Sequence, residues 1–452
     1  MMGGKPANPA PRPNARTLSV AALDRLQRDA FGFFLAESNP VNGLVPDSTR
    51  PGSPSSIAAV GFALAAYAAG AERGFMTRGE AIARVLATLR FFWQSPQGVE
   101  RDATGYKGFY YHFLDMRTGR RAWASELSTI DTTFLLAGAL AAAAYFDRDA
   151  ADEREISSLA DALYRRADWQ WAQHGGLTVA HAWKPERGFA RARWEGYSEA
   201  ILLYALGLGS PTHPLPEASY TEWTRTYRWR TVHGLEHLYA GPLFIHQLSH
   251  IWIDFRGIPD ASMRARGIDY FENSRRATLA QQAYAIRNPR RFEGYGESCW
   301  GLTASDGPGP GTRRIDGIER RFFDYRARSV PFGPDDGTIA PWAAVASLPF
   351  APEIVLPTIR HFVEAHPKST SDAGLLRSFN PTFRVGDRGA RDWHSPACYG
   401  LEQGPIVLMI ENYRSESLWR SMKRCPYLVT GLRRAGFAGG WLATGTPPRS
   451  GG

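Results

Sequence analysis

The stretch that decides the fold is RWEGYSEAILLYALGLGSPTHP, residues 193–214. It begins with aromatic and acidic residues and continues as a helix that is apolar on almost every face, and such a helix is normally buried. The acidic residues Glu195 and Glu199 stand at its front end, where one turn of helix would place them on one face. The sequence therefore predicts two carboxylates where a core opens to solvent, and carboxylates rarely stabilise a protein there.

The aromatic neighbours Trp194 and Tyr197 bear on what these carboxylates can do. Because removal from water raises the pKa of a carboxyl group, a glutamate beside such rings can stay protonated near neutral pH and serve as a general acid. Glycoside hydrolysis needs that acid and a second carboxylate. The alternative is a helix N-terminus whose acidic residues only complement the macrodipole.

Outward from this stretch, apolar helices alternate with amphipathic ones. Aromatic, turn-rich segments at 105–126 and 177–189 are typical of short β-hairpins or ordered loops. The pattern predicts an all-α toroid of helical hairpins, with short β-hairpins and loops at the rim of its pocket. The expected apolar helices are 56–70, 128–146 and 195–208. The expected amphipathic helices are 17–37, 77–94 and 155–173, and Thr77 with Glu80 predicts a capping box at the start of the second. Further helices are expected at 242–254, 260–286, 338–348, 352–365 and 403–422.

The ends of the chain differ from its middle. Residues 1–16 are rich in Pro and Ala and are expected to be disordered, residues 17–436 to form a single catalytic domain, and residues 437–452 to be a mobile tail. The opening has no apolar core of a signal sequence, so as written the protein is expected in the cytoplasm and not at a membrane. A periplasmic location would follow if a signal peptide had been removed.

The amino-acid composition narrows the classes of ligand that the protein is expected to bind. The 53 basic and 44 acidic residues give a net charge of +9, but the basic residues are scattered, so nucleic acid is not an expected partner. Several of the fourteen tryptophans stand beside Gly, Asp or Glu, which suits sugars better. The three cysteines, Cys299, Cys398 and Cys425, are odd in number and widely spaced. Free buried thiols are therefore expected rather than disulfides or a zinc cluster. We expect a monomer without metal or cofactor.

The segment WASELSTIDTT, residues 123–133, places Glu126 and Asp131 at the entrance of an expected apolar helix, beside Trp123. Entry loops of a toroid line its pocket, so both carboxylates are candidates for the second catalytic group. The alternative is a serine cap with Glu126 complementing the helix dipole. Asp131 lies about one helical turn beyond Glu126, so Glu126 is expected at the rim, freer to face water.

The segment GPLFIHQLSHIWIDFR, residues 241–256, spaces His246 and His250 as i and i+4, a pattern that can bind metal on one helix face. No further ligand stands at an obvious spacing, so hydrogen bonding to sugar hydroxyls, or simple burial, is favoured. Other polar residues near expected helix starts are candidates for sugar binding, although structural turns explain them equally well. The candidates are Gln247, Asp254, Arg256, Asn273, Trp300, Thr303, Asp306, Asp336 and Gln403.

Several long motifs resemble the glucoamylase-like domain of bacterial enzymes that act on β-1,2-glucan, which includes endo-β-1,2-glucanases and the processing domain of cyclic β-1,2-glucan synthases. The resemblance covers most of residues 20–425. The motifs are GLVPD (43–47), SELSTIDT (125–132), GYSEA (196–200), GSPTHP (209–214), GPLFIHQLSHIWIDFRG (241–257), IDYFENSRRAT (268–278), WGLTASDGPG (300–309), DDGTIAP (335–341) and QGPIVLMIENYR (403–414).

The resemblance implies an (α/α)6 toroid, or six-hairpin barrel, and a general acid at Glu199. It also implies a second essential acidic residue, best matched by Glu126 with Asp131 as the competitor. Tyr197 and His213 fall within matching motifs and are added to the expected sugar-binding residues. The leading hypothesis is an inverting glycoside hydrolase of β-1,2-glucan or its oligosaccharides. The alternatives are a retaining transglycosylase and a carbohydrate-binding toroid without catalysis.

Overall fold

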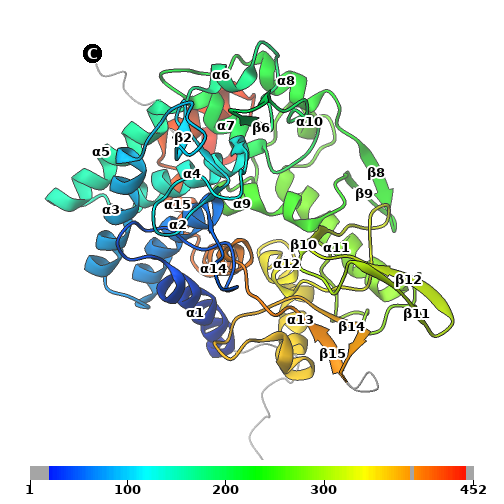
Figure 1. Cartoon of the computed structure of the whole chain (residues 1–452). Helices are drawn as coiled ribbons and strands as arrows, with labels where there is room; N and C mark the ends of the chain where they lie inside the picture. Colours follow the sequence, from blue (N-terminus) through cyan, green and yellow to red (C-terminus); the bar gives the residue numbers. More distant parts are fainter. Residues whose placement is uncertain (1–19, 387–390, 444–452) are drawn as a thin grey trace, which may run out of the picture.

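The computed structural model describes residues 20–386 and 391–443 and is rich in helices (Figure 1). Some helices are buried along their whole length or nearly so, whereas others bury only one face. The buried helices are α2 (Ile57–Arg73), α4 (Thr129–Tyr145), α7 (Ile201–Gly209), α9 (Leu248–Trp252), α12 (Pro341–Ala346) and α14 (Gly400–Arg414). The others are α1 (Val20–Glu37), α3 (Arg78–Gln94), α5 (Ala151–Arg166), α6 (Trp169–Gln173), α8 (Ala218–Thr224), α10 (Ala261–Arg264), α11 (Tyr270–Arg287), α13 (Pro352–Ala365), α15 (Ser417–Met422), α16 (Pro426–Arg434) and α17 (Gly440–Ala443). The 3-10 turns are η1 (Leu243–His246) and η2 (Pro367–Ser369).

The buried helices α2 and α4 are in close contact, and two glycines allow it. A Cβ atom added at Gly61 would lie 2.2 Å from the carbonyl oxygen of Phe134, and one added at Gly138 would lie 2.1 Å from that of Gly61. The two backbones therefore touch, which no residue with a side chain would permit. Small residues on α2 and α4 thus hold two buried helices together.

Short strands lie between many of the helices in the chain. A five-stranded sheet has the order β2-β3-β5-β6-β7, and the remaining strands form antiparallel pairs, β1 with β4, β8 with β9, β10 with β13, β11 with β12 and β14 with β15. The strands are β1 (Ser55–Ser56), β2 (Gly105–Tyr106), β3 (Phe109–Tyr111), β4 (Phe113–Leu114), β5 (Leu127–Ser128), β6 (Ala182–Lys184), β7 (Gly188–Phe189), β8 (Trp229–Val232), β9 (Leu235–Leu238), β10 (Ala304–Ser305), β11 (Gly311–Ile315), β12 (Ile318–Phe322), β13 (Arg326–Ala327), β14 (Phe379–Val385) and β15 (Arg391–His394).

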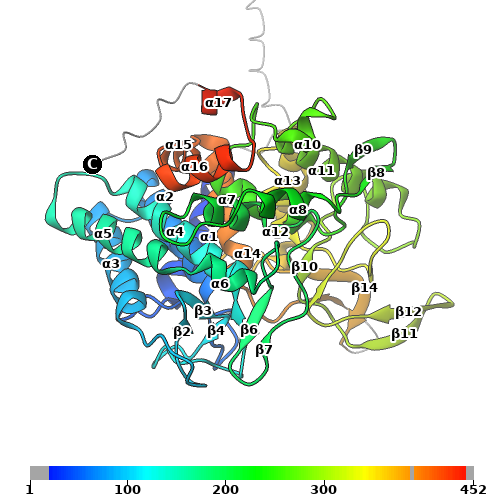
Figure 2. The same cartoon turned by 90° about the horizontal axis from the view of Figure 1, so that it is seen from above.

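Most of the strands lie on one side of the molecule, which we call the strand side. Figure 2 shows β2–β4, β6, β7, β11, β12 and β14 on the side away from α15, α16 and α17. Because β1 runs directly into α2 and β5 directly into α4, the N-terminal ends of these buried helices open on the strand side. Polar residues at those helix starts therefore face the same region.

Helices far apart in the chain lie side by side. The first helix, α1, packs against α14, which also contacts α2 and α12 (Figure 1). Glu411 of α14 is buried and accepts hydrogen bonds from Gln27 of α1 and Arg73 of α2. Gln247, directly before α9, donates to the carbonyl oxygen of Ala343 in α12. The arrangement agrees with an α/α toroid decorated with β-hairpins.

Most expected helices are present, but several are shorter or divided. The capping box predicted at Thr77 and Glu80 begins α3. The helix expected at 195–208 begins only at Ile201, and Gly196 adopts φ 76°, a left-handed conformation that keeps Glu195 and Gly196 out of the helix. Glu195 and Glu199 therefore do not share a helix face, contrary to the prediction. The helices expected at 155–173, 242–254, 260–286 and 403–422 are each divided in two.

The expected mobile tail at 437–452 begins too early. Phe437 and Leu442 are buried, and α17 lies within this segment, so residues 437–443 belong to the folded body. The expected tail at 1–16 and the end at 444–452 lie outside the described residues. Over the described parts of the chain, none of the helices combines the length and apolar character required to cross a membrane. The three cysteines are free and buried, as expected.

Candidate active site

Four acidic residues and one histidine gather where the buried helices start, and we call them the carboxylate cluster: Asp47, His112, Glu126, Asp131 and Glu199. His112, between β3 and β4, is at the centre. Its Nδ1 lies 3.0 Å from Oε1 of Glu126, and its Nε2 lies 3.6 Å from Oδ2 of Asp131. The antiparallel pairing of β3 with β5 places His112 beside Glu126, while Asp131 lies in the first turn of α4. One imidazole thus bridges two carboxylates.

The electrostatics of His112 and Glu126 are those of an ion pair. Burial lowers the pKa of His112, but the charges of Asp131, Glu126 and Asp47 outweigh it and raise that pKa to about 9. The hydrogen bond from His112 in turn lowers the pKa of Glu126 to about 2, against the effect of burial. At neutral pH His112 is therefore a cation and Glu126 an anion.

Glu199 has the opposite character. It stands in the turn before α7, where its carbonyl oxygen accepts a 2.7 Å hydrogen bond from Oγ of Ser249. Burial of its carboxyl group, with a further contribution from the negative charge of Asp131, raises its pKa to about 7. Glu199 is thus close to half protonated at neutral pH, and Asp131 lies near enough for its charge to act on Glu199. Glu195, four residues earlier, is exposed and accepts a hydrogen bond from Thr178.

Asp47 completes the cluster from the loop after α1. Burial raises its pKa to about 6, although the charge of His112 acts in the opposite direction. The negative charge of Asp131 raises the pKa further. Both Asp47 and Glu199 therefore have carboxyl groups that can carry a proton within one or two units of neutral pH, a property that is enriched at functional sites.

A second acidic group adjoins the cluster, formed by Asp306 and Glu402. Oδ2 of Asp306 accepts hydrogen bonds from Arg50, at 2.7 Å, and from Ser395, at 2.8 Å. Glu402, in the first turn of α14, is buried, and its Oε1 has no hydrogen-bond partner among the described residues. Burial, together with the charges of Asp306 and Asp47, raises the pKa of Glu402 well above its usual range. Asp47 thus links the two acidic groups.

Three of the expected sugar-binding residues lie beside Glu199 in sequence or structure. The hydroxyl of Tyr197 lies 3.3 Å from Nδ1 of His246, whose Nε2 lies 3.1 Å from the carbonyl oxygen of Ala240. His250 lies in α9 with its Nε2 2.9 Å from Oγ of Ser274. Burial lowers the pKa of both histidines to about 3, so they are neutral. The helix break at Gln247 removes the shared helix face that the i, i+4 spacing predicted.

Most other expected site residues make structural contacts. Six buried residues hydrogen-bond with backbone or neighbouring side chains, and they are Gln247, Asn273, Trp300, Thr303, Asp336 and Gln403. Asp254 pairs with Arg256 and with Lys423 after the end of α9. His213 follows the C-terminal end of α7, whereas Glu199 precedes the N-terminal end. Nδ1 of His213 lies 3.8 Å from Oδ1 of Asp168. Trp123 is 67% exposed and packs on Phe113, close in sequence to Glu126.

Sequence reasoning missed His112, Asp47, Arg50 and Glu402 as members of the site. Asp47 is the last residue of the motif GLVPD, but the sequence around it does not indicate which side chains it contacts. His112 stands among aromatic residues, and only the pairing of β3 with β5 brings it beside Glu126. Glu402 directly precedes Gln403, which was the residue expected in the site. The rotation of α14 about its own axis determines which of the two side chains lies near Asp306.

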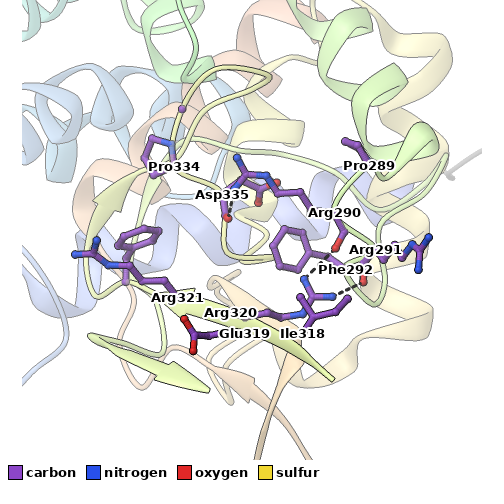
Figure 3. A pocket seen from close by; sticks show the side chains of 12 residues that line it. Pro289, Arg290, Arg291, Phe292, Ile318, Glu319, Arg320, Arg321, Pro334 and Asp335 are labelled. Carbon is purple, nitrogen blue, oxygen red and sulfur yellow. Dashed lines mark hydrogen bonds between the residues drawn. The ribbon is translucent and has the colours of Figure 1, made fainter. Parts of the chain in front are cut away.

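Two cavities lie on the strand side or beside it. One of about 600 Å³ is lined by Glu126 and by the β6–β7 hairpin, including Trp183 and Phe189. It offers aromatic surface beside the carboxylate cluster. Another of about 590 Å³ is lined by arginines, among them Arg320, which donates to the carbonyl oxygens of Arg290 and Arg291 (Figure 3). Its lining residues do not include any member of the carboxylate cluster.

Comparison with known proteins agrees with this geometry. The family model Glycoamylase, described as “Putative glucoamylase”, matches residues 191–426, which is more than half of the chain. A solved structure with the same description, from Bacteroides uniformis, is 32% identical, has a TM-score of 0.82, and covers 94% of this chain and 99% of its own. The chain therefore belongs to the glucoamylase-like family.

Two further relatives have names that mention a substrate. An endo-β-1,2-glucanase from Chitinophaga pinensis, solved with sophorotriose and glucose, is 25% identical with a TM-score of 0.82 and covers 94% of this chain and 100% of its own. An exo-β-1,2-glucooligosaccharide sophorohydrolase (non-reducing end) from Parabacteroides distasonis is 29% identical over 449 residues, which is 91% of this chain. The chain spans 57% of the length of that curated relative.

Proposed function

We propose that this protein is a glycoside hydrolase of β-1,2-linked glucan or its oligosaccharides. The observation that carries the proposal is the carboxyl group of Glu199, whose pKa of about 7 leaves a proton available at neutral pH beside the anionic part of the cluster. The names of the relatives supply the substrate class. The aromatic cavity beside Glu126 supports sugar binding, because apolar rings pack well against sugar faces.

In the proposed reaction, Glu199 donates its proton to the glycosidic oxygen as the bond to the anomeric carbon breaks. The leaving sugar departs with a neutral hydroxyl group, and water adds to the anomeric carbon. General-acid catalysis of this kind is worth roughly 10²–10⁴-fold in rate. Glu199 is suited to this role because its backbone is held by Ser249 while its carboxyl group is shielded from water.

We infer that Asp131, rather than Glu126, accepts the proton of the attacking water. The charge of Asp131 acts on Glu199, whereas Glu126 is engaged by the cation of His112 and is a weak base with a pKa of about 2. His112 would then orient Asp131 through the 3.6 Å contact and stabilise its charge. The sequence favours Glu126 instead, because that residue is expected at the rim of the pocket and free to face water. Glu126 is kept as the second candidate.

The proposed architecture is a closed (α/α)6 toroid, a single catalytic domain over residues 17–436 extended by residues 437–443. The contacts of α2 with α4 and α14, and the hydrogen bond from Gln247 to α12, support a ring of six buried helices. We expect inversion at the anomeric carbon and a monomer that needs neither metal nor cofactor. Neither nucleic acid nor a membrane is an expected partner.

The decisive variant is Glu199→Gln, which removes the proton but keeps the shape of the side chain. We expect kcat on linear β-1,2-glucan to fall by about 10²–10⁴-fold while glucan affinity stays within a few-fold. Glu195→Gln is the matched control, because Glu195 is exposed and carries the same chemical group four residues earlier. Equal activity of the two folded variants would refute the assignment of Glu199.

The products distinguish the proposed hydrolase from its alternatives. Hydrolysis with inversion releases α-anomers, which nuclear magnetic resonance detects before mutarotation. Retained anomers with products longer than the substrate would indicate a transglycosylase, and binding without products a carbohydrate-binding toroid. Release of a single short product would indicate cleavage from a chain end, whereas products of many lengths would indicate cleavage within the chain.

A further inference from the structure

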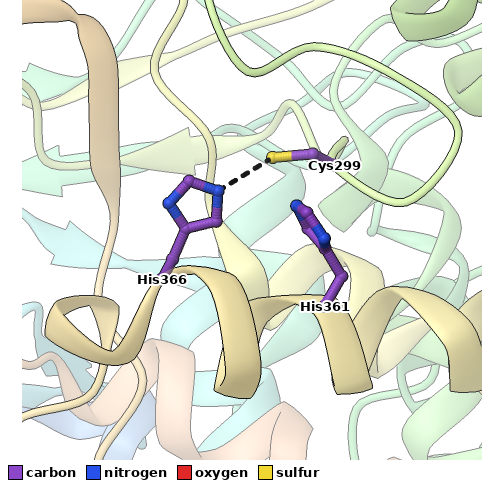
Figure 4. A group of neighbouring side chains, drawn as sticks. All are labelled: Cys299, His361 and His366. Carbon is purple, nitrogen blue, oxygen red and sulfur yellow. Dashed lines mark hydrogen bonds between the residues drawn. The ribbon is translucent and has the colours of Figure 1, made fainter.

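Three side chains with metal-binding atoms converge outside the carboxylate cluster: Cys299, His361 and His366 (Figure 4). One ligand atom from each, the sulfur or an imidazole nitrogen, lies within 4.8 Å of the other two. Sγ of Cys299 and Nε2 of His366 are 4.0 Å apart. We propose that this triad binds a divalent cation that prefers sulfur and nitrogen ligands, with Zn²⁺ as the first candidate.

Local structure explains why the three side chains meet. His361 lies in the last turns of α13, and His366 follows the helix end with φ −124° and ψ 57°, a non-helical conformation. This turn brings the two imidazole rings to a centroid separation of 5.3 Å. Four residues separate the two histidines, within the spacing of three to five that is usual for histidine pairs in zinc sites. Cys299 reaches them from a turn closed by hydrogen bonds with Gly296.

The ligand set suits zinc. Zn²⁺ prefers Cys sulfur and His nitrogen in tetrahedral geometry, and three protein ligands leave a fourth position for water or another small ligand. Zn–S and Zn–N bonds of about 2.3 Å and 2.0–2.1 Å place the two ligand atoms about 3.6 Å apart, so the Cys299–His366 pair needs only a small adjustment. His361 is half-buried, and its side chain can rotate to shorten the wider separations.

The two imidazole rings are available to a metal, whereas the buried thiol must first lose its proton. Burial lowers the pKa of both His361 and His366, so each ring is neutral and keeps a lone pair. Burial raises the pKa of Cys299 to about 12, so its thiol is inert as a nucleophile and would lose its proton to solvent when the metal binds. Among the described residues, the imidazole of His361 makes no hydrogen bond with protein, and the imidazole of His366 hydrogen-bonds only with Cys299 while it packs on the rings of His361 and Phe379.

A bound cation would join the end of α13 to the chain that leads to Thr303 and Asp306. Its expected effect is therefore on stability, because the triad does not include a member of the carboxylate cluster. This is separate from the proposed hydrolysis, for which we expect no metal requirement. It differs from the sequence-based expectation that the cysteines are only buried thiols, since that expectation rested on spacing along the chain and the triad joins distant segments.

The test is a titration of the untagged full chain, freed of metal by a chelator, with Zn²⁺ in a calorimeter. We expect one equivalent to bind and to raise the unfolding temperature. Cys299→Ser and His361→Gln should each weaken zinc binding by about 100-fold or more, since even the loss of residues that only support metal ligands costs 10–100-fold. Cys398→Ser is the matched control, because Cys398 is also buried and free but is not part of the triad.

Cobalt provides an independent readout. Co²⁺ bound to a thiolate gives a sulfur-to-metal charge-transfer absorption, which should be present in the wild-type chain and in Cys398→Ser but absent in Cys299→Ser. Stoichiometric binding that none of the triad variants weakens, or failure of the wild-type chain to bind zinc, would overturn the proposal. If Cys299→Ser fails to fold, His361→Gln decides the question, because His361 is half-buried and better tolerated as a variant.

Discussion

At the scale of single residues, the carboxylate cluster gives its carboxyl groups different pKa values, whereas isolated carboxyl groups of the same kind would have the same pKa. Glu126 and Glu199 are the same amino acid, yet their pKa values are about 2 and about 7. The hydrogen bond to His112 accounts chiefly for the first value and burial for the second. Pairs of titratable groups whose pKa values are driven apart are typical of acid–base catalysis. An anionic and a protonated carboxyl group thus coexist in the cluster at neutral pH.

The pH profile of the proposed hydrolysis should reflect Glu199. Because the general acid must be protonated, we expect kcat/KM on β-1,2-glucan to be highest below pH 7 and to fall tenfold per pH unit well above it. Initial rates between pH 5 and 9, with folding monitored by circular dichroism, measure this. A rate that stays constant from pH 6 to pH 9 would be incompatible with Glu199 as the acid.

His112 should make stability depend on pH. Its pKa is about 9 in the folded protein against about 6.5 in an unfolded chain, so its contribution is complete below pH 6.5 and is lost as pH rises through 9. We expect the free energy of unfolding to decrease between pH 6.5 and 9 more steeply in the wild-type chain than in His112→Gln. Urea unfolding at several pH values tests this, and parallel curves for the two proteins would contradict it.

At the scale of elements, the contact between α2 and α4 depends on the absence of side chains. In Gly61→Ala the new methyl group would meet the backbone of Phe134, which cannot move aside as a side chain can. We expect a loss of about 3 kcal/mol or more of unfolding free energy, at or above the usual cost of overpacking. Gly79→Ala in α3 has open space around the new Cβ and should be neutral or stabilising by up to about 1 kcal/mol.

Denaturant unfolding of both alanine variants provides the measurement. A Gly61→Ala protein as stable as Gly79→Ala would mean that α2 and α4 can move apart without loss of packing. Because α4 carries Asp131 near its start, a shift of this helix should also lower activity, whereas Gly79→Ala should not affect it.

The elements also show what the sequence can and cannot predict. Apolar periodicity located α2, α4 and α13, and the capping box located the start of α3, because these signals are local. Periodicity did not reveal the left-handed Gly196 or the start of α7 at Ile201, which leaves Glu199 outside the helix. Glu126, Asp131 and Glu199 could be named as candidates, but His112 could not, because its position depends on pairing between strands.

At the scale of the whole molecule, Glu411 connects the first helices of the chain to a late one. It is fully buried in α14, and Gln27 of α1, Arg73 of α2 and Ser417 of α15 donate hydrogen bonds to it. These bonds, with the contact of α1 and α14, should make the described body of the chain unfold as one unit. The carboxylate cluster depends on this cooperative folding, because its residues come from distant segments of the chain.

We therefore expect Glu411→Ala to cost about 3–5 kcal/mol, the usual effect of breaking one side of a buried ion pair. Glu155→Ala is the matched control, because Arg90 binds Glu155 with two similar hydrogen bonds at the surface, where such a pair contributes under about 1 kcal/mol. Circular dichroism and tryptophan fluorescence, followed during unfolding of each variant, should give coincident transitions. Separate transitions in the wild-type chain would show that α1 is not coupled to α14.

The negative charge gathered around His112 has a consequence for inhibitors. A sugar analogue that carries a protonated amine near the anomeric position gains Coulomb attraction in this shielded site, while an uncharged analogue of the same shape does not. As pH rises past 7, Glu199 becomes a further anion and the amine keeps its charge. The preference for the cationic analogue therefore grows in the pH range where turnover declines, so an amine of this kind binds best to the enzyme in its least active protonation state.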